Sequence, residues 1–439
     1  MGQRESLLIA IGQRLDWLPE LRREVWILAA GQLLLFIGQG FTLVYASIYF
    51  VNQLGFSPTQ VGLAQASSGL AGTLGRFWAG NAVDSTGLGR RGSLLLAAAI
   101  AGLASFVLAG AQTFPLLVAG NLLLGLGISL YWPATLSVTT DLTPPEHLTE
   151  AMALTRLADN LGLGLGALLA GQYLARSGSY PLLFIFKGVA YWLFGLVVFA
   201  TIAETRPDEL GLVATGLGER LRAWGQALSD RRFGAYLLAN IFFTTYAAQI
   251  SSTLPLYLAN YVPAGNGDQG FSEAFISYLF VWHALLKILL QLPVTRWLRA
   301  VSHVNLLLLS LLMWTLGFGL VWLVGIVSTG ALMVAVAGFA VIAAAEILYG
   351  PSASALVGDL APVTRRGIYF ALESECWSIG FLVGPALGGW GLDHPAILGT
   401  NLWLALVSSA AIAFMILIWL RMQPEVSQGA AMPLSSENP

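Results

Sequence analysis

The sequence predicts an all-α membrane protein with twelve transmembrane helices in two pseudo-symmetric six-helix bundles. Three observations lead to this prediction. First, 56% of the 439 residues are hydrophobic and only 10% are charged, whereas soluble domains carry about 25% charged residues. Second, twelve apolar stretches reach the length of about 20 residues that a helix needs to cross a bilayer. Third, the chain contains an internal repeat.

The repeat relates the segment from about Gly125 to Leu174 to a second segment half a chain later. The first copy carries Tyr131, Pro133, Asp141, Pro144, Gly162, Gly166 and Gly171, and the second carries Tyr349, Pro351, Asp359, Pro362, Gly380, Gly384 and Gly389. Every pair has the same separation in the chain, without a gap. A duplicated, membrane-embedded chain is typical of a transporter whose binding site lies between two related halves.

The apolar stretches define the domain organisation. The first six cover roughly 25–50, 58–82, 92–112, 114–140, 149–175 and 180–203. The second six cover roughly 233–261, 273–297, 303–327, 330–357, 367–391 and 396–420. We therefore expect an N-terminal bundle over 25–204, a polar linker over 205–232 and a C-terminal bundle over 233–421.

Two further segments flank the bundles. Residues 1–24 alternate arginines with leucines and isoleucine, which predicts an amphipathic helix on the cytoplasmic membrane surface. Residues 422–439 are polar and are expected to form a disordered cytoplasmic tail.

Basic residues predict the orientation, because they collect in cytoplasmic loops. They follow the second, sixth, eighth and tenth stretches: Arg90 and Arg91, the arginines of the linker, Arg296 and Arg299, then Arg365 and Arg366. The opposite loops hold almost none, with Arg176 as the exception. We expect both termini and the linker in the cytoplasm. The compact loops favour a bacterial inner membrane.

Composition argues against several other classes of protein. The net charge of −2 gives no basic surface for nucleic acid. The single cysteine, Cys376, excludes an intrachain disulfide and a cysteine-rich metal site. The four histidines form no metal-spaced cluster, there is no Gly-x-Ser-x-Gly motif, and neither Lys187 nor Lys287 follows a glycine as a phosphate-binding loop requires. We expect neither an enzyme nor a primary pump, no metal or cofactor, and a monomer surrounded by membrane lipids.

The loop after the second stretch carries the most specific motif. It reads Gly80-Asn-Ala-Val-Asp84-Ser-Thr-Gly87-Leu-Gly89-Arg90-Arg91, which resembles the signature loop of the major facilitator superfamily. Gly80 permits close helix approach, Asp84 can accept hydrogen bonds from a helix N-terminus, and Gly87 permits a tight turn. The resemblance covers nearly the whole chain. It implies that this loop braces helix 2 against helix 11 when the cytoplasmic side is shut.

The chain departs from the family pattern at three positions. Ser85 replaces the usual basic residue of the loop. Helix 5 has Ala167 where an antiporter motif has proline, although helix 11 carries the glycine-proline form at Gly384 and Pro385. Asn121 stands where many proton-coupled members have an arginine. These departures weaken the inference of proton-coupled antiport.

Ionisable side chains within the stretches are the main candidates for function, because each costs roughly 2.5–3.5 kcal/mol to insert at mid-bilayer. Glu346 lies in the middle of helix 10, which in this family borders the central cavity. It is suited to bind a proton, a cationic substrate, or each in turn. The alternative is a carboxylate paired with a buried cation or hydrogen-bonded to a tyrosine. His283 is a candidate proton relay or a hydrogen-bonded core residue.

Four other charges are predicted to gate the cytoplasmic side. Arg76 with Glu373, and Asp159 with Lys287, have matching depths, and the resemblance implies that their helices meet across the halves. We expect both pairs to bridge the halves and to break when that side opens. The alternative is pairing within one half, because Arg156 and Asp159 form an i, i+3 pair. Lys187 is expected to pair locally or to snorkel.

The resemblance implies that the first, fourth, seventh and tenth stretches surround the substrate cavity, so their neutral polar and aromatic side chains are candidates for its lining. They are Gln32, Gln39, Tyr45, Tyr131, Trp132, Asn240, Tyr246, Gln249 and Tyr349. Amide and aromatic walls with one acid suit an amphipathic, cationic organic molecule. The alternative is that many of them pack helices together or lie at the membrane interface.

These features predict a secondary active transporter that works by rocker-switch alternating access and exports a small amphipathic or drug-like molecule against protons. Alternatives remain: an uncoupled facilitator or symporter of a small metabolite, which Asn121 favours, a lipid or glycolipid flippase, or a receptor-like member that does not transport. A polytopic membrane enzyme is the alternative from a different class.

Overall fold

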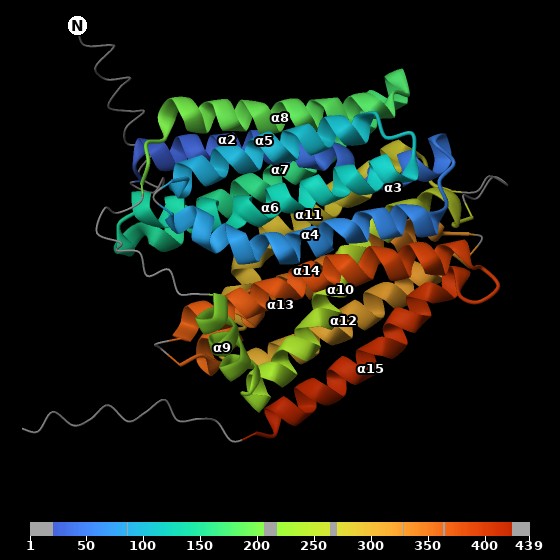
Figure 1. Cartoon of the computed structure of the whole chain (residues 1–439). Coiled ribbons are helices and arrows are strands. Elements are labelled where there is room, and N and C mark those ends of the chain that lie inside the picture. Colours follow the sequence, from blue (N-terminus) through green and yellow to red (C-terminus); the bar gives the residue numbers. More distant parts are fainter. Residues whose placement is uncertain are drawn as a thin grey trace, which may run out of the picture.

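The computed structural model describes residues 21–85, 87–205, 217–263, 270–327, 329–362 and 365–423. The regular elements within these ranges are helices. The predicted N-terminal surface helix and disordered tail fall almost wholly outside them. Figure 1 shows the long helices running roughly side by side in two groups, one from each half of the chain.

Six long helices form the first half. They are α2 (Arg23–Leu43), α4 (Pro58–Asp84), α5 (Gly89–Ala109), α6 (Phe114–Leu142), α7 (Leu148–Ser177) and α8 (Tyr180–Thr201). The short α3 (Ala46–Ile48) and the π-helical η1 (Tyr49–Gln53) prolong the first span beyond α2, and the 3₁₀ turn η2 (Pro145–His147) precedes α7.

Six long helices also form the second half. They are α10 (Arg231–Asn260), α11 (Glu273–Trp297), α12 (His303–Val324), α13 (Ala331–Leu360), α14 (Arg366–Asp393) and α15 (Leu402–Arg421), the last preceded by η4 (Gly399–Asn401). The twelve predicted stretches match these helices to within a few residues at most ends. The linker helix α9 (Leu217–Leu228) was not expected. Trp224 packs it against the second-half core.

Local chemistry explains where several helices begin. Ser57 forms a capping box with Gln60, and Pro58 occupies the first helical turn of α4, where a missing N–H costs nothing. The carboxylate of Asp230 accepts hydrogen bonds from the first amides of α10. At its end, α7 stops at Gly178, which adopts the left-handed conformation with φ of 65°.

Eight of the described membrane-length helical segments are apolar enough to cross a bilayer by composition. The long helices outside that set are α4, α7, α10 and α14. Of these, α4 packs against α14, and α7 packs against α11. Both contacts join the two halves, so α4, α7 and α14 expose less surface to lipid. Their polar residues are therefore compatible with a membrane location.

The internal repeat appears as structural symmetry. Pro133 lies inside α6 and Pro351 inside α13. Gly171 of α7 meets Ser277 of α11, in the other half, and Gly389 of α14 correspondingly meets Pro58 of α4. A Cβ atom at either glycine would overlap its neighbour across the halves. The two halves therefore meet through equivalent glycine contacts.

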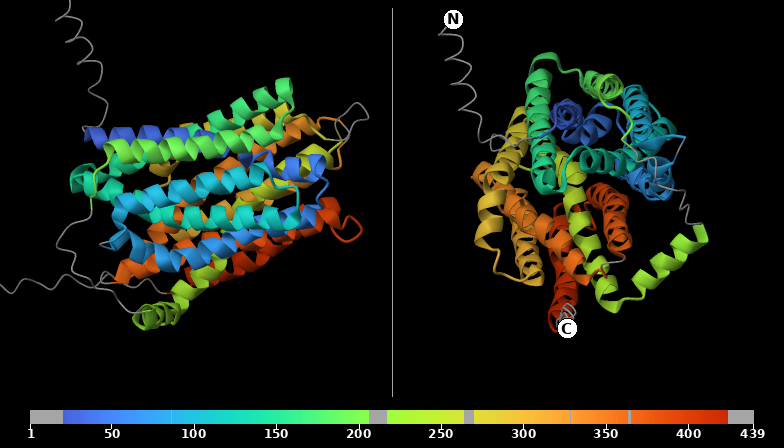
Figure 2. Two further views of the ribbon diagram at one scale, coloured as in Figure 1. Left: turned by 45° about the horizontal axis from the view of Figure 1, so that its top comes forward. Right: turned by 90° about the vertical axis from the view of Figure 1, so that its left-hand side faces the viewer.

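Two ends of the molecule can be distinguished. We call the end with the start of α2, helix α9 and the end of α15 the inner end, and the opposite end the outer end (Figures 1 and 2). The arginine pattern predicts that the inner end faces the cytoplasm.

Candidate functional site

A network of polar contacts joins the halves at the outer end. Tyr45 of α2's extension donates a hydrogen bond to the Glu273 carbonyl at 2.8 Å and contacts the Ser277 hydroxyl. Ser277 in turn donates to the Ala167 carbonyl of α7 at 2.8 Å, and Tyr180 donates to the Glu273 carboxylate at 2.9 Å. The first turns of α11 are thus held by three segments of the other half.

Three more contacts extend this closure. Asn52 and Asn260 exchange side-chain hydrogen bonds of 2.9 and 2.7 Å. Thr59 donates to Asp393 at 2.6 Å, and Ser47 donates to the Ser252 carbonyl at 2.7 Å. We refer to all these contacts as the outer seal. Its residues are Tyr45, Ser47, Asn52, Thr59, Ala167, Tyr180, Ser252, Asn260, Glu273, Ser277 and Asp393. They close the outer end in this structure.

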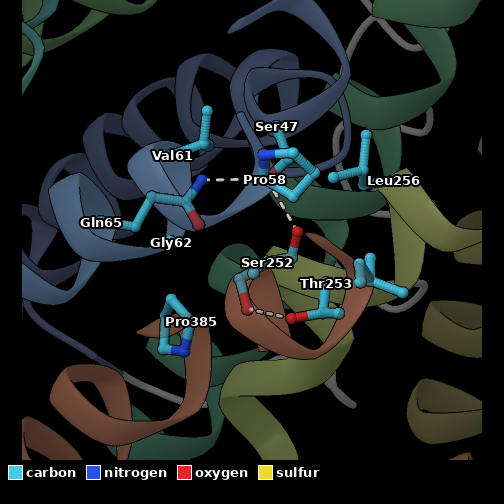
Figure 3. Close-up of a pocket in the computed structure, with 11 residues that line it drawn as sticks. Ser47, Pro58, Val61, Gly62, Gln65, Ser252, Thr253, Leu256 and Pro385 are labelled. Atoms are coloured by element: carbon cyan, nitrogen blue, oxygen red, sulfur yellow. Dashed lines mark hydrogen bonds between the residues drawn. The ribbon is translucent and has the colours of Figure 1, made fainter. Parts of the chain in front are cut away.

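A small cavity of about 10 Å³ lies beside the seal between α4, α10 and α14. Figure 3 shows the Gln65 amide pointing at Ser47, while Ser252 contacts Thr253 on the opposite wall. The space is about the size of one water molecule. It is too small for an organic substrate.

In the structure the nearest acidic partner of Arg76 is Glu375, two residues after the predicted Glu373. Arg76 of α4 donates to the Ser374 carbonyl of α14, and its guanidinium lies 3.9 Å from the carboxylate of Glu375. Helices 2 and 11 do meet, as expected. Glu373 and Glu375 lie within one turn of α14 and so at nearly the same depth in the membrane. The rotation of α14 about its axis decides which of the two points toward α4, and in this structure it is Glu375.

The predicted Asp159–Lys287 bridge is not formed in this structure. Lys287 of α11 donates a 2.6 Å hydrogen bond to Glu346 of α13, within the second half. Asp159 instead lies 3.9 Å from Arg156, one turn earlier on α7. Helices α7 and α11 do pack together. The two charges nevertheless find partners inside their own halves.

Glu346 is therefore not an isolated carboxylate. Its Oε2 atom contacts Lys287 Nζ, and His283 Nε2 lies 3.5 Å away. His283 and Lys287 are four residues apart on α11, so they present the same face to α13. All three side chains are largely buried, with exposures of 10% for His283, 27% for Lys287 and 16% for Glu346. We refer to His283, Lys287 and Glu346 as the charge cluster.

Tyr131 and Tyr349, which are equivalent in the internal repeat, form similar hydrogen bonds in the two halves. In the first half, Gln32 of α2 donates to the Tyr131 hydroxyl of α6 at 3.2 Å. In the second half, the Tyr349 hydroxyl of α13 donates to Asn240 of α10 at 2.7 Å. Each pair joins the first and fourth spans of its half.

The other predicted cavity residues divide into two groups. Gln39 and Trp132 are partly exposed, and the Arg156 guanidinium lies 5.1 Å from the centroid of the Trp132 ring. Tyr246 and Gln249 are fully buried instead. Tyr246 contacts Ser409 at 2.7 Å, and Gln249 donates to the Gly384 carbonyl at 2.8 Å.

These contacts show the partners that three of the predicted residues have in this structure. Tyr246 and Gln249 pack the second half rather than line a cavity in this structure, and Tyr45 belongs to the outer seal. The sequence does not determine helix rotation, so it could not separate such residues from true lining residues.

The signature loop contacts its own half. Arg90 pairs with Asp141 at the end of α6, and Glu204 accepts hydrogen bonds from the backbone amides of Arg90 and Arg91 at 3.0 and 3.2 Å. Arg91 also donates to the Phe199 carbonyl at 2.7 Å. These contacts bind the inner ends of α5, α6 and α8 together.

The structure says less about the glycines and the aspartate of that loop. Gly87 is exposed, with open space where a Cβ would lie. The side chain of Asp84 and the surroundings of Gly80 lie outside the described part of the structure, so their predicted gating role is untested. In the second half, His303 lies 3.6 Å from Asp359, which is the symmetric counterpart of Arg90 with Asp141.

Lys187 is buried and donates to the Thr42 hydroxyl of α2 at 3.1 Å. This fits the expected local pairing. Within the described ranges, no three histidine, cysteine or acidic side chains are grouped so that they could hold a metal ion.

Sequence reasoning missed most of the outer seal. Asn52, Asn260, Glu273 and Ser277 stand at helix ends, where polar residues are ordinary and carry no motif. The repeat offered one signal: Gly171 and Gly389 are equivalent, and equivalent glycines in a duplicated transporter indicate close helix contacts. That signal identifies where the halves touch but not the polar partners.

The family assignment follows from comparison of the whole chain. The model of the family described as Major Facilitator Superfamily matches residues 28–263 and again 261–434. The chain belongs to the major facilitator superfamily. It is a multi-pass membrane transporter of small molecules, and not an enzyme.

Two curated relatives illustrate the family's range. The chain is 28% identical over 405 residues to the multidrug resistance protein MdtH of Cronobacter sakazakii, covering 89% of this chain and 92% of the relative. It is 24% identical over 374 residues to a Na(+), Li(+), K(+)/H(+) antiporter of Planococcus maritimus, covering 80% of this chain and 85% of the relative.

Solved structures confirm the fold. The nucleoside transporter NupG superposes with a TM-score of 0.76 at 15% identity, over 92% of this chain and 100% of that chain. A D-xylose-proton symporter superposes with a TM-score of 0.70 at 14% identity, over 91% and 98% of the respective chains. At these identities the likeness concerns the fold alone.

Proposed function

We propose that this member of the superfamily is a proton-coupled exporter of small amphipathic, cationic organic molecules. It works by rocker-switch alternating access as a monomer in a bacterial inner membrane, with both termini in the cytoplasm. The central observation is the charge cluster, in which Glu346 is held between Lys287 and His283 in the middle of α13.

A proton and Lys287 compete for the same carboxylate oxygen. With the 2.6 Å contact intact, the charges of Lys287 and Glu346 cancel, which suits a site inside a bilayer. Protonation of Glu346 removes its negative charge and leaves Lys287 as an uncompensated cation in a region of low dielectric constant. That state is costly, so proton uptake favours a rearrangement that hydrates or re-pairs Lys287. The cluster is thereby suited to convert a proton into movement of α11 relative to α13.

Helix α11 contributes residues both to the charge cluster and to the outer seal. Its outer turns hold Glu273 and Ser277, which belong to the outer seal, and its middle holds His283 and Lys287. Ser277 precedes Lys287 by ten residues, or about 15 Å of helix. A shift of α11 at the charge cluster would therefore act on the contacts with Tyr45 and Tyr180. In this proposal, α11 moves as a rigid helix and transmits the change at the charge cluster directly to the outer seal.

The relatives support efflux of drug-like molecules. Several are named multidrug resistance protein MdtH, at 25–28% identity and with at least 87% of this chain covered. The aromatic and amide side chains on the first and fourth spans of each half suit amphipathic substrates better than sugars. Asn121, which replaces a family arginine, donates to the Leu117 carbonyl within its own helix at 2.9 Å.

The test uses proteoliposomes that contain the full chain and an imposed pH gradient. We expect lipophilic cations such as tetraphenylphosphonium or ethidium to accumulate against their gradient, and we expect nigericin, which collapses the pH gradient, to abolish that accumulation. Movement that only equalises concentrations and ignores the pH gradient would point to a facilitator instead.

A second candidate is the exchange of inorganic monovalent cations for protons. One specific observation favours it, the relative named Na(+), Li(+), K(+)/H(+) antiporter. The same vesicles distinguish the two. Proton release triggered by Na⁺, Li⁺ or K⁺ salts, with no response to organic cations, would support this second function and contradict the first.

A further inference from the structure

Asp159 is an unusual carboxylate. It is 6% exposed in the first half, yet its Oδ1 atom has no hydrogen-bond partner among the described residues. A buried carboxylate oxygen without a partner costs free energy. Asp159 does not reach Lys287, and no contact of the outer seal uses it. A group kept at this cost inside a transmembrane bundle indicates a function.

Arg156 is held only loosely to Asp159. Its guanidinium lies 3.9 Å from Asp159 Oδ2, beyond hydrogen-bond range, and the Arg156 side chain is 69% exposed. The same guanidinium carbon lies 5.1 Å from the centroid of the Trp132 ring, which is the geometry of a cation–π contact. Arg156 therefore places a positive charge between a carboxylate and an aromatic face without binding either tightly.

The residues around Trp132 offer further groups that attract a cation. The rings of Phe36 and Tyr131 lie 6.0 and 5.3 Å from the Trp132 ring. Gln32 donates to Tyr131 at 3.2 Å, while its own Oε1 atom is buried without a partner among the described residues. Aromatic faces, one carboxylate and a free amide oxygen are all groups that attract a cation. Apart from Arg156, these residues present no positive charge.

Packing fixes these groups in place. Gly162 follows Asp159 by three residues on the same face of α7, and it meets Leu33 and Phe36 of α2 so closely that a Cβ would overlap them. Asp159 therefore lies on the face of α7 that packs against α2, and its carboxylate interacts electrostatically with Tyr131 of α6. The arrangement does not depend on a mobile loop.

We propose that Asp159 and Trp132 bind the positive group of the transported molecule, an organic monovalent cation, which takes the place that the Arg156 guanidinium occupies in this structure. The inference rests on the proposed export of cationic amphipaths and names the residues that recognise the cation. Arg156 acts as a resident cation that neutralises Asp159 while the site is without substrate. Glu346 remains the separate proton site of the other half.

The proposal predicts opposite effects for two neighbouring residues. Asp159→Asn removes the charge that attracts the cation, so tetraphenylphosphonium should bind at least tenfold more weakly. Arg156→Gln removes the competitor, so the same probe should bind several-fold more tightly. A merely structural Arg156–Asp159 pair would instead give weaker binding or lower stability for both variants.

The experiment is equilibrium binding of radiolabelled tetraphenylphosphonium to the full chain in detergent, with uncharged triphenylphosphine oxide as a second ligand. Glu150→Gln is the matched control, because Glu150 is an exposed carboxylate on the same helix that pairs with His147 at 3.1 Å. The control should bind like the wild type. Asp159→Asn should keep its affinity for the uncharged ligand, and Asp159→Glu should restore binding of the cation.

Unchanged cation affinity in a folded Asp159→Asn variant would overturn the proposal. So would weaker binding in Arg156→Gln, which remains decisive if the aspartate variant fails to fold. The assay needs no pH gradient and leaves Glu346 intact. Failure of proton coupling would therefore appear in the vesicle experiment and not here.

Discussion

Lys287 and Glu346 lie 2.6 Å apart on neighbouring helices of the second half. This pair replaces the predicted contact of Lys287 with Asp159 across the halves. It therefore does not open and close with the rocking of the halves. It reports instead on the relative position of α11 and α13, and α11 is the helix whose outer turns are bound to the first half. Control of α11 by a proton at Glu346 is the central claim of our account.

The first prediction concerns this ion pair. Lys287→Met leaves Glu346 without its closest cation, and Glu346→Lys places two cations side by side, so both should lower thermal stability in detergent. Removing one partner of a buried pair costs about 3–5 kcal/mol, and partial exposure should reduce that value. The exchanged variant Glu346→Lys/Lys287→Glu should recover part of the stability. A double variant as unstable as the sum of the singles would contradict a direct contact.

The second prediction concerns Arg76 on the inner side of the interface. Arg76 contacts the carbonyl of Ser374 and lies 3.9 Å from Glu375. A double-mutant cycle of Arg76→Gln with Glu375→Gln should therefore show non-additive effects on transport rate. The matched cycle with Glu373→Gln should show weaker coupling. Equal coupling to both acids would mean that Arg76 exchanges between them during transport.

The third prediction concerns the equivalent glycines at the interface. Gly389→Ala would drive a methyl group into Pro58, and Gly171→Ala would drive one into Ser277. Both variants should disfavour closure of the outer end, so cysteine labels at that end should react faster and export should slow by tenfold or more. Gly358→Ala is the control, because the space around its absent Cβ is open. Normal transport by both interface variants would show that the outer end never closes this tightly.

The fourth prediction tests the outer seal directly. Asn52 and Asn260 are joined by hydrogen bonds of 2.7 and 2.9 Å, so cysteines at both positions should crosslink. The native Cys376 is buried, and replacing it with serine provides the background. The crosslinked protein should not transport, and reduction should restore activity. Full activity with the crosslink intact would exclude opening at this point.

Much of the fold was predictable from the sequence, because hydropathy and the repeat are properties of whole segments. The predicted stretch 273–297 coincides with α11, and Pro133 and Pro351 occupy equivalent helices. The linker helix α9 was missed. It lies in a polar segment that carries no signal of membrane crossing.

Individual side-chain partners were far less predictable. Spacing along the chain gives depth in the membrane, so it correctly placed Arg76 near the Glu373–Glu375 turn. It does not give rotation about the helix axis, which decides whether Lys287 meets Asp159 or Glu346. The same limit applies to Tyr246, whose hydroxyl forms a hydrogen bond with Ser409 inside the bundle.

The most direct test of the central claim compares the wild type with Glu346→Gln in proteoliposomes that contain a pH-sensitive dye. We predict that the wild type releases protons when tetraphenylphosphonium is added and accumulates it against a gradient. The Glu346→Gln variant should still exchange internal for external substrate, but it should neither release protons nor accumulate substrate. Accumulation by the variant driven by a pH gradient as strongly as in the wild type would contradict the assignment of Glu346 as the proton carrier.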